Sequence, residues 1–172
     1  MPPSKSRTRA AGGRASSSSA DAVHLPGIFR PGSTIDGLNA MSIGTAMEPL
    51  GILFTELGPD FLRATMPVDA RTRQPYGLLH GGASVLLAET LGSSAGMLCV
   101  GEDEGCVGIE INANHLRAVS KGTLRVEAKS IYHGRTLSVW QVEITNERGK
   151  LICVSRCTLS LKKGAAFPAK NS

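Results

Sequence analysis

The stretch QPYGLLHGGASVLLAETLGSSAG, residues Gln74–Gly96, contains the longest mainly apolar segment of the chain. After Ala83, every residue in it is apolar or small except Glu89 and its neighbour Thr90. The length suits a helix of about four to five turns, which we expect at about residues 82–100. Because this helix would be apolar nearly all round, it must be enclosed by other elements on most sides.

Strand-like segments lie on both sides of this helix. Two precede it and turn at Gly58-Pro59-Asp60, and four more follow it in a row, joined by short loops. Consecutive strands with short connections favour an antiparallel sheet. The sequence therefore predicts an α+β fold, in which about six strands wrap around one long helix. The expected strands are Leu50–Leu57, Phe61–Val68, Cys106–Leu116, Thr123–Tyr132, Thr136–Thr145 and Leu151–Leu161, with a short helix at Thr34–Ser42 capped by Ser33 or Thr34.

Length and charge limit the class of protein. The 172 residues suffice for one domain, which we expect at 27–163, with a disordered basic and Ser-rich tail at 1–26 and a C-terminal tail at 164–172. Residues 1–22 hold four basic residues against Asp21, which accounts for +3 of the net charge of +5. The remaining body is too weakly basic for a nucleic-acid footprint, and no apolar run is long enough to span a membrane. A transit peptide is the alternative to a plain solvated tail.

The cysteines and histidines predict neither a disulfide framework nor a metal site. The four cysteines form no CxxC motif, and no secretory apolar segment precedes the domain. The four histidines are scattered without zinc-ligand spacing. We therefore expect a cytoplasmic protein with no metal and no cofactor.

Glu89 is the unusual residue of the long helix. On a helical wheel, apolar neighbours occupy the directions around it, while Ser93 lies on the same side four residues later. Gly82 lies on that side too, seven residues earlier and about 10 Å along the axis. One interpretation is a glutamate that reaches water at the edge of the sheet or caps a strand. The other is a partly buried carboxylate that acts as a general base or nucleophile.

The loop before the helix favours the functional interpretation. Gly81 and Gly82 at a helix start expose backbone N–H groups to a ligand, and the helix dipole favours negative charge there. Gln74 adds a side-chain donor, so the segment outlines an oxyanion site. His80 alone would be a structural histidine, but beside two glycines and ahead of Glu89 it becomes a site candidate.

These motifs resemble a known family. QPYGLLHGGASVLLAETLGS, followed by GIEINANHLRAV and VWQVEITNERGKL, is similar to the hotdog-fold acyl-coenzyme A thioesterases over about residues 50–161. The resemblance is to the branch that acts on phenylacetyl-, hydroxybenzoyl- and dihydroxynaphthoyl-coenzyme A or proofreads enterobactin synthesis. It implies an acyl-coenzyme A substrate and a homodimer with a continuous sheet, paired again into a homotetramer, with the active site between subunits.

The resemblance also implies a role for each matched residue. Glu89 would be the nucleophile or general base, and Ser93 would position the carboxylate or the water. Gln74 and the Gly81 N–H would hold the thioester carbonyl, and His80 would orient the substrate or help the thiolate leave. The residues expected towards coenzyme A are Gly82, His115, Arg117, Gly134 and Arg135, although both arginines fit equally well as ordinary surface charges.

Two other functions remain open on the sequence alone. A hydratase or dehydratase would use a catalytic His/Asp pair, which is not evident near the helix. A non-catalytic acyl-coenzyme A binding module would not need a buried carboxylate beside Gln74, His80 and Ser93. The sequence does not choose between direct attack by Glu89 and activation of a water.

Overall fold

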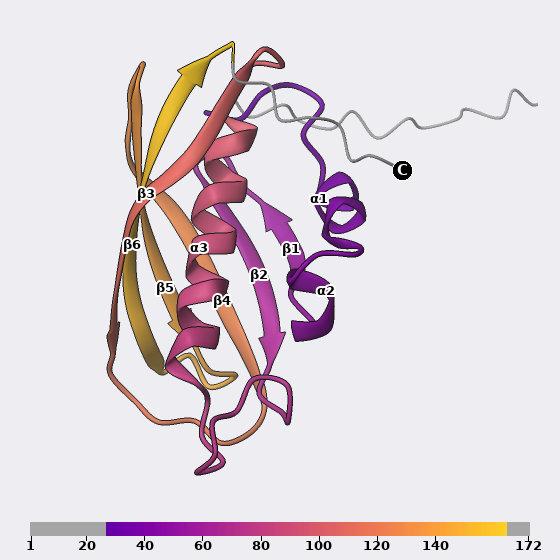
Figure 1. The fold of residues 1–172 in the computed structure, drawn as a ribbon, viewed down its shortest axis with the longest axis vertical. Helices are drawn as coiled ribbons and strands as arrows, with labels where there is room; N and C mark the ends of the chain where they lie inside the picture. The colour runs from indigo at the N-terminus through magenta and orange to yellow at the C-terminus, as the bar shows by residue number, and fades with distance from the viewer. Residues whose placement is uncertain (1–26, 165–172) are drawn as a thin grey trace, which may run out of the picture.

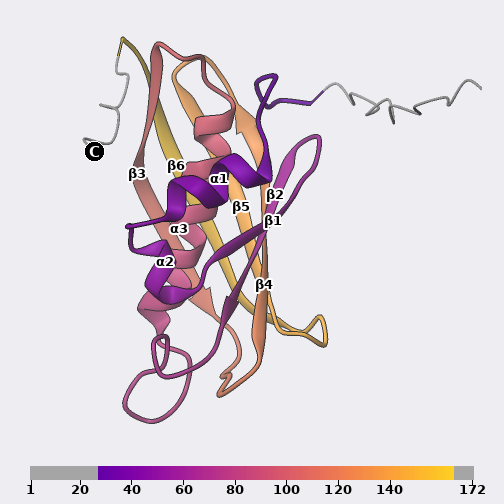
Figure 2. The same cartoon turned by 90° about the vertical axis from the view of Figure 1, so that its right-hand side faces the viewer.

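The computed structural model describes residues 27–164, so the predicted N-terminal tail at 1–26 and all of the predicted C-terminal tail at 164–172 except Gly164 lie outside the described residues. One antiparallel sheet of six strands, in the order β1-β2-β4-β5-β6-β3, curves around the long helix α3 (Figures 1 and 2). The α+β fold with one long helix under the sheet is therefore confirmed. The elements are α1 Ile35–Ser42, α2 Met47–Leu50, β1 Leu53–Leu57, β2 Phe61–Pro67, α3 Gly81–Leu98, β3 Glu104–His115, β4 Thr123–His133, β5 Leu137–Thr145 and β6 Leu151–Lys163.

The order of the strands differs in one respect from the order along the chain. Strands β4, β5 and β6 pair consecutively through short turns, as expected. Strand β3 does not pair with β4, although they are neighbours in sequence; it pairs with β6 at the far side of the sheet. The 116–122 segment crosses below the helix to connect them (Figure 1). As a result β3 is an edge strand, and most of its side chains after Cys106 are exposed.

Helix α3 packs closely against the sheet because small residues line the contact. A Cβ atom added at Gly92 would lie 2.7 Å from Cys157 Cβ, and one added at Gly96 would lie 3.0 Å from Cys106 Sγ. The helix carries buried Leu87, and the sheet opposite it contributes the fully buried Trp140. Burial of this contiguous apolar cluster is the main stabilising contribution to the domain.

Several element boundaries differ from those expected. Leu50 belongs to the one-turn helix α2, and β1 begins at Leu53, because Gly51 adopts a left-handed φ of 67° that ends the helix. Helix α3 is one residue longer at its start than expected and ends at Leu98 rather than Val100. Strand β3 spans Glu104–His115, so it begins two residues before the expected start at Cys106 and ends one residue before Leu116. No helix among residues 27–164 is long and apolar enough to cross a membrane.

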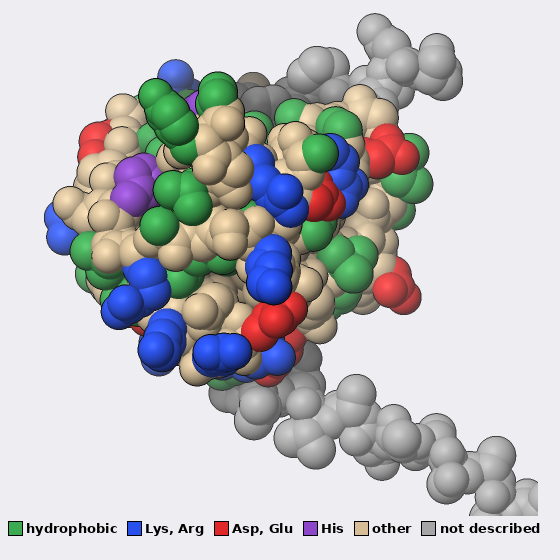
Figure 3. Space-filling view, turned by 90° about the horizontal axis from the view of Figure 1, so that it is seen from below, with side chains coloured by type: hydrophobic (Ala, Val, Ile, Leu, Met, Phe, Trp, Pro, Cys, Tyr) green, Lys and Arg blue, Asp and Glu red, His purple; other side chains and the backbone are tan. Residues whose placement is uncertain are grey.

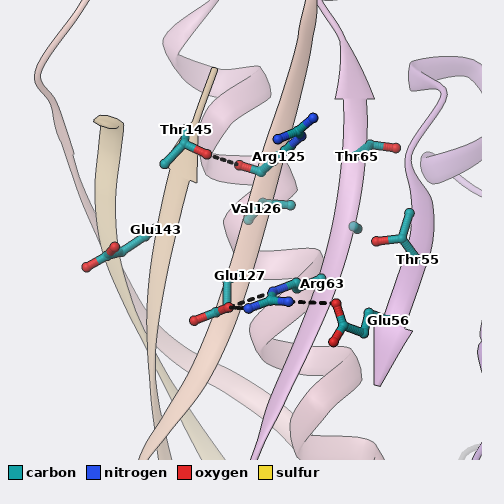
Figure 4. A pocket seen from close by; sticks show the side chains of 10 residues that line it. Thr55, Glu56, Arg63, Thr65, Arg125, Val126, Glu127, Glu143 and Thr145 are labelled. Atoms are coloured by element: carbon teal, nitrogen blue, oxygen red, sulfur yellow. Dashed lines mark hydrogen bonds and ion pairs between the residues drawn. The ribbon is translucent and has the colours of Figure 1, made fainter. Parts of the chain in front are cut away.

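The outer face of the sheet is polar. A hollow of about 570 Å³ lies over β1, β2, β4 and β5 (Figure 4). Within it, Arg63 forms ion pairs of 2.6 Å with both Glu56 and Glu127. Because these charged groups are paired and face water, the hollow has the character of a solvated sheet surface. The candidate site residues lie elsewhere, around α3.

Candidate active site

The Glu89 carboxylate is half-buried on α3 and held by hydrogen bonds. Ser93, one helical turn later, donates its hydroxyl to Glu89 Oε1 at 2.7 Å. The Cys157 thiol on β6 donates to Oε2 at 3.4 Å. On the β3 side, a Cβ atom added at Gly108 would lie 2.5 Å from Oε1, so the missing side chain leaves room for the carboxylate. The predicted Glu89–Ser93 pairing is thus present in the structure.

A mainly apolar hollow of about 350 Å³ opens beside this carboxylate. It lies between α3 and the segment that joins α1 to α2. The hydroxyl-bearing residues at its wall are Thr45, Thr90 and Ser94, in addition to Ser93. The wall thus combines an apolar surface with several hydroxyl groups around one carboxylate. The residues that line it are Thr45, Ala46, Met47, Leu86, Glu89, Thr90, Ser93 and Ser94.

The loop before α3 has a fixed conformation. Thr72 is buried, and its hydroxyl donates to the Pro67 carbonyl at 2.9 Å. The Thr72 carbonyl in turn accepts the His80 backbone N–H at 2.8 Å. The Leu79 N–H donates to the Val119 carbonyl at 2.7 Å. These bonds connect both ends of the loop to the sheet and to the crossover segment, and so they hold the helix start in place.

His80 is the N-cap of α3. Its Nδ1 accepts the Gly82 N–H at 2.8 Å, so a neutral His80 ring carries its proton on Nε2. The His80 carbonyl accepts the N–H groups of Ala83 and Ser84. Among the described residues, the Gly81 N–H has no recorded partner, so it is the donor that the helix start offers to a ligand. His80 therefore has a structural role whatever else it does.

Gln74 and His115 lie at this helix start. They line one hollow of about 360 Å³ together with Gly81 and Arg117. The Gln74 side-chain oxygen accepts the Tyr76 N–H, which leaves the amide nitrogen as the donor group of this side chain. A Cβ atom added at Gly81 would lie 3.1 Å from His115 Nε2, so glycine lets the His115 ring approach the helix start. The structure brings these four predicted residues together.

The predicted site residues nevertheless fall into three separate places within one chain. The hollow at Gln74 and the hollow at Glu89 share no lining residue. Glu89 lies eight positions after Gly81 on the helix, which corresponds to about 12 Å along the axis. Gly134 and Arg135 line a third hollow, of about 220 Å³, with residues near the C-terminal end of α3. A single chain therefore does not bring all of the predicted catalytic and coenzyme A-binding residues together in one site.

The end of the molecule at the start of α3 is rich in basic side chains. Viewed from below, Lys and Arg gather along one side of this face (Figure 3). The connections 68–80, 116–122 and 146–150 contain six basic residues against Asp69 and Glu147. Arg71 is paired with Asp69 at 2.5 Å, and it lowers the Asp69 pKa to about 2 through a side-chain hydrogen bond. The balance of charge at this end suits an anionic ligand.

Two contributors to the Glu89 environment are not among the site residues predicted from the sequence. Cys157 and Gly108 lie on strands far from Glu89 in sequence, and both contact its carboxylate in the fold. Alternation along Leu151–Leu161 predicts that Cys157 lies on the inner face of the sheet. It does not predict that Cys157 contacts Glu89. The Glu89 contact depends on the register of β6 against α3, which no local pattern encodes.

Comparison with known proteins fits this architecture. Residues 76–153 match the model of the thioesterase superfamily. The chain is 49% identical to 1,4-dihydroxy-2-naphthoyl-CoA hydrolase of Escherichia coli over 134 residues, which cover 78% of this chain and 98% of that protein. The proofreading thioesterase EntH of Cronobacter sakazakii matches with the same identity and coverage. A crystal structure of a Haemophilus influenzae thioesterase, 46% identical, superposes with a TM-score of 0.78 over 83% of this chain and 99% of that one.

The range that matches the superfamily model contains the whole of α3, with Gly81, Glu89 and Ser93. Relatives that are about half identical over nearly their whole length are named as thioesterases or hydrolases. The resemblance inferred from the helix segment is confirmed. The chain therefore belongs to the thioesterase superfamily and is a thioester hydrolase of the hotdog fold.

Proposed function

We propose that this enzyme hydrolyses acyl-coenzyme A, with an aromatic acyl group favoured. The net reaction consumes one water, breaks the thioester C–S bond, and gives the free acid and coenzyme A thiol. The step uses only protein side chains and water, so the proposal includes no metal and no cofactor. The observation that carries it is the half-buried Glu89 carboxylate held by Ser93 at the wall of a mainly apolar hollow.

Glu89 is the proposed nucleophile or general base. In direct attack, a carboxylate oxygen bonds to the carbonyl carbon, coenzyme A thiolate leaves, and water hydrolyses the resulting anhydride. In general-base catalysis, Glu89 takes a proton from the attacking water. In either case the Gly81 N–H and the Gln74 amide hold the carbonyl oxygen as it gains negative charge. His80 presents an Nε2–H that can reach the leaving group or the substrate.

The proposed site lies between two subunits. One carbonyl cannot contact both the Gly81 N–H and Glu89 of the same chain, because they are about 12 Å apart along α3. Strand β3 is a long edge strand, and pairing it antiparallel with the β3 of a second copy would extend the sheet. Such a two-fold pairing would also bring the start of one α3 towards the partner subunit's Glu89. We therefore propose a homodimer with two shared sites, assembling further into a homotetramer.

The same pairing accounts for the two sets of predicted coenzyme A contacts. His115 and Arg117 lie at the start of α3, and Gly134 and Arg135 lie near its end. In a two-fold dimer with antiparallel α3 helices, the start of one α3 lies beside the end of the partner's α3. The four residues, with Gly82 at the mouth of the helix, would then surround one coenzyme A handle. Arginine suits its phosphates because it binds them in bidentate fashion.

The hollow beside Glu89 is the proposed site of the acyl group. Its apolar lining suits a ring, and the hydroxyls of Thr45, Thr90 and Ser94 suit polar substituents on that ring. The name of the Escherichia coli relative, a 1,4-dihydroxy-2-naphthoyl-CoA hydrolase, points to the same class of acyl group. This supports a hydroxylated aromatic acyl-coenzyme A as the substrate class.

The test is release of free coenzyme A thiol from a panel of thioesters by wild type and Glu89→Gln. The panel contains benzoyl-, hydroxybenzoyl-, dihydroxynaphthoyl-, phenylacetyl- and straight-chain acyl-coenzyme A. We expect the highest kcat/KM for a hydroxylated aromatic substrate, and a loss of at least about a hundredfold in Glu89→Gln.

Glu143→Gln is the matched control. It removes the same charge from an exposed position on the outer face of β5 and should leave turnover unchanged. A Glu89→Gln enzyme that is folded and turns over near the wild-type rate would overturn the proposed role of Glu89. Equal rates across the whole panel would overturn the proposed substrate class.

A further inference from the structure

The two oxygens of the Glu89 carboxylate are held from different elements. Ser93 of α3 donates to Oε1 at 2.7 Å, and Cys157 of β6 donates to Oε2 at 3.4 Å. The first contact lies within one helix and follows that helix if it moves. The second connects the helix to the sheet. The Cys157 contact is therefore the one that fixes the carboxylate relative to the rest of the domain.

Two glycines form the slot that the thiol and the carboxylate share. On the helix side, a Cβ atom added at Gly92 would lie 2.8 Å from Cys157 Sγ. On the strand side, a Cβ atom added at Gly108 would lie 2.5 Å from Glu89 Oε1. Any larger residue at either position would separate α3 from β6 or displace the carboxylate. The close contact thus depends on three elements, α3, β3 and β6.

The Cys157 thiol is protonated and screened from water. Its side chain is fully buried, and burial raises its pKa, with the nearby Glu89 charge raising it further. A protonated thiol has one hydrogen to donate, and the recorded acceptor is Glu89 Oε2. In the folded protein this thiol therefore acts as a donor to the carboxylate, not as a nucleophile.

We infer that Cys157 is a positioning residue for thioester hydrolysis, which acts by anchoring Oε2 of Glu89 to the sheet through its S–H group. This inference rests on the proposed function, because it concerns the carboxylate to which that function assigns the chemistry. Loss of the anchor leaves the Glu89 carboxylate bonded to Ser93 alone, so its position relative to the sheet is less precisely fixed. A reacting group held less precisely makes productive attack rarer, without changing how the substrate is bound.

The alternative is that Cys157 only fills space, as buried cysteines commonly do. Cys153 provides a matched control because it lies four residues earlier on the same strand, is equally buried, and directs its thiol at the Val154 carbonyl rather than at Glu89. Cys153→Ala removes the same volume from the same core. Any effect specific to Cys157→Ala then arises from the Glu89 contact.

The kinetic experiment compares Cys157→Ala, Cys157→Ser and Cys153→Ala with wild type. We expect Cys157→Ala to lower kcat by about threefold to tenfold with KM almost unchanged, since a thiol is a weak donor. Cys157→Ser keeps a donor of similar size and should restore most of kcat. Cys153→Ala should keep the wild-type kcat. Equal kcat for Cys157→Ala and Cys153→Ala would overturn the inference, and so would a Cys157→Ser enzyme no better than Cys157→Ala.

An infrared measurement tests the contact itself and does not depend on activity. The S–H stretching band of Cys157, identified by its loss in Cys157→Ser, should lie at lower frequency than that of Cys153 because a carboxylate accepts its hydrogen. In Glu89→Ala this band should shift upward, while the Cys153 band stays in place. An unshifted band would overturn the inference even if Cys157→Ala fails to fold. A shifted band together with an active Glu89→Gln enzyme would instead establish the Cys157–Glu89 contact and place the failure in the proposed role of Glu89, which would remove the positioning role with it.

Discussion

At the scale of single residues, the site depends on space as much as on functional groups. The Glu89 carboxylate occupies a volume that a side chain at position 108 would fill. Glycine there has no turn to make, since Gly108 lies within β3 and is not among the glycines with positive φ. The close approach of the carboxylate is a sufficient physical reason for glycine at this position.

Gly108→Ala should therefore reduce activity without removing any functional group. The added methyl group would meet the flexible end of Glu89, so the carboxylate would move while the backbone stays in place. We expect kcat to fall by about tenfold to a hundredfold, because a displacement of about 1 Å suffices for that loss, with a melting temperature near that of wild type.

The control for this variant is Gly101→Ala, where the nearest atom to the added methyl would be Glu104 Oε2 at 3.7 Å. It should keep full activity. Light scattering on both variants checks that the oligomeric mass is unchanged. Full activity of Gly108→Ala would show that the carboxylate has more freedom than its contacts indicate.

At the scale of elements, the decisive contact is that of α3 with β6. Gly92 faces Cys157, with an added Cβ only 2.7 Å from Cys157 Cβ, which is fixed to the backbone. Gly92→Ala would therefore push helix and sheet apart. The cost of overpacking a core, about 1–3 kcal/mol, exceeds the gain in helix propensity of up to about 1 kcal/mol.

We expect Gly92→Ala to lower the free energy of unfolding by about 1–2 kcal/mol, and the melting temperature by several degrees. The matched control is Gly37→Ala on α1, where the added methyl would meet only the Thr34 hydroxyl at 3.1 Å. The free energy of unfolding of the Gly37→Ala variant should differ little from that of wild type. Thermal denaturation followed by circular dichroism measures both, and a Gly92→Ala protein as stable as wild type would show that α3 adjusts without cost.

The thiols of the core should be unreactive in the native protein. Burial raises the pKa of Cys99 to about 12 and that of Cys106 to about 11, and raises those of Cys153 and Cys157 as well. Because the raised pKa values disfavour the thiolate, almost no thiolate exists at pH 8, and its fraction grows only as the pH approaches these values.

Labelling with an aromatic disulfide reagent at pH 8 should accordingly be slow for the native protein and complete for the unfolded one, with free coenzyme A as the fast reference thiol. Because the enzyme thiols react slowly, the same reagent measures the coenzyme A thiol released in the hydrolysis assay without a contribution from the enzyme. Fast stoichiometric labelling of the native protein at pH 8 would contradict the burial of these side chains.

Elements with a strong local pattern could be predicted from the sequence. The continuous apolar run of α3 and the alternation of β4 and β5 are properties of each segment alone, and the ends of these elements lie within two residues of the expected ones. The one-turn helix α2 has no such pattern, and Leu50 was assigned to the next strand. The pairing of β3 with β6 is a long-range choice that short loops alone do not reveal.

The site could be predicted only where its residues are close in sequence. Glu89 and Ser93 are one helical turn apart, and Gln74 and Gly81 flank one loop, so spacing alone predicts two groups. Cys157 was missed because its contact with Glu89 spans 68 residues. The 12 Å between the two groups, and the role of the β3 edge in bringing them together, depend on the arrangement of the whole fold.

At the scale of the whole molecule, the unpaired edge of β3 is the main unsatisfied feature. Strand β3 has 12 residues and pairs only with β6 among the described residues. Ile109 on this strand is 58% exposed although apolar. A long edge with exposed apolar side chains favours pairing with a second strand. The same pairing would complete the site, so assembly and activity should depend on each other.

The most direct test of the shared site is subunit complementation between Glu89→Gln and Gln74→Ala. Each variant alone should be nearly inactive, because every site lacks one essential group. When the two chains are co-expressed in equal amounts and mix at random, about a quarter of the sites should combine an intact Glu89 with an intact Gln74 from the other chain. The account predicts recovery of about a quarter of wild-type kcat in the mixture. A mixture that is verified to contain both chains in one oligomer, yet is no more active than its parents, would contradict a site built between subunits.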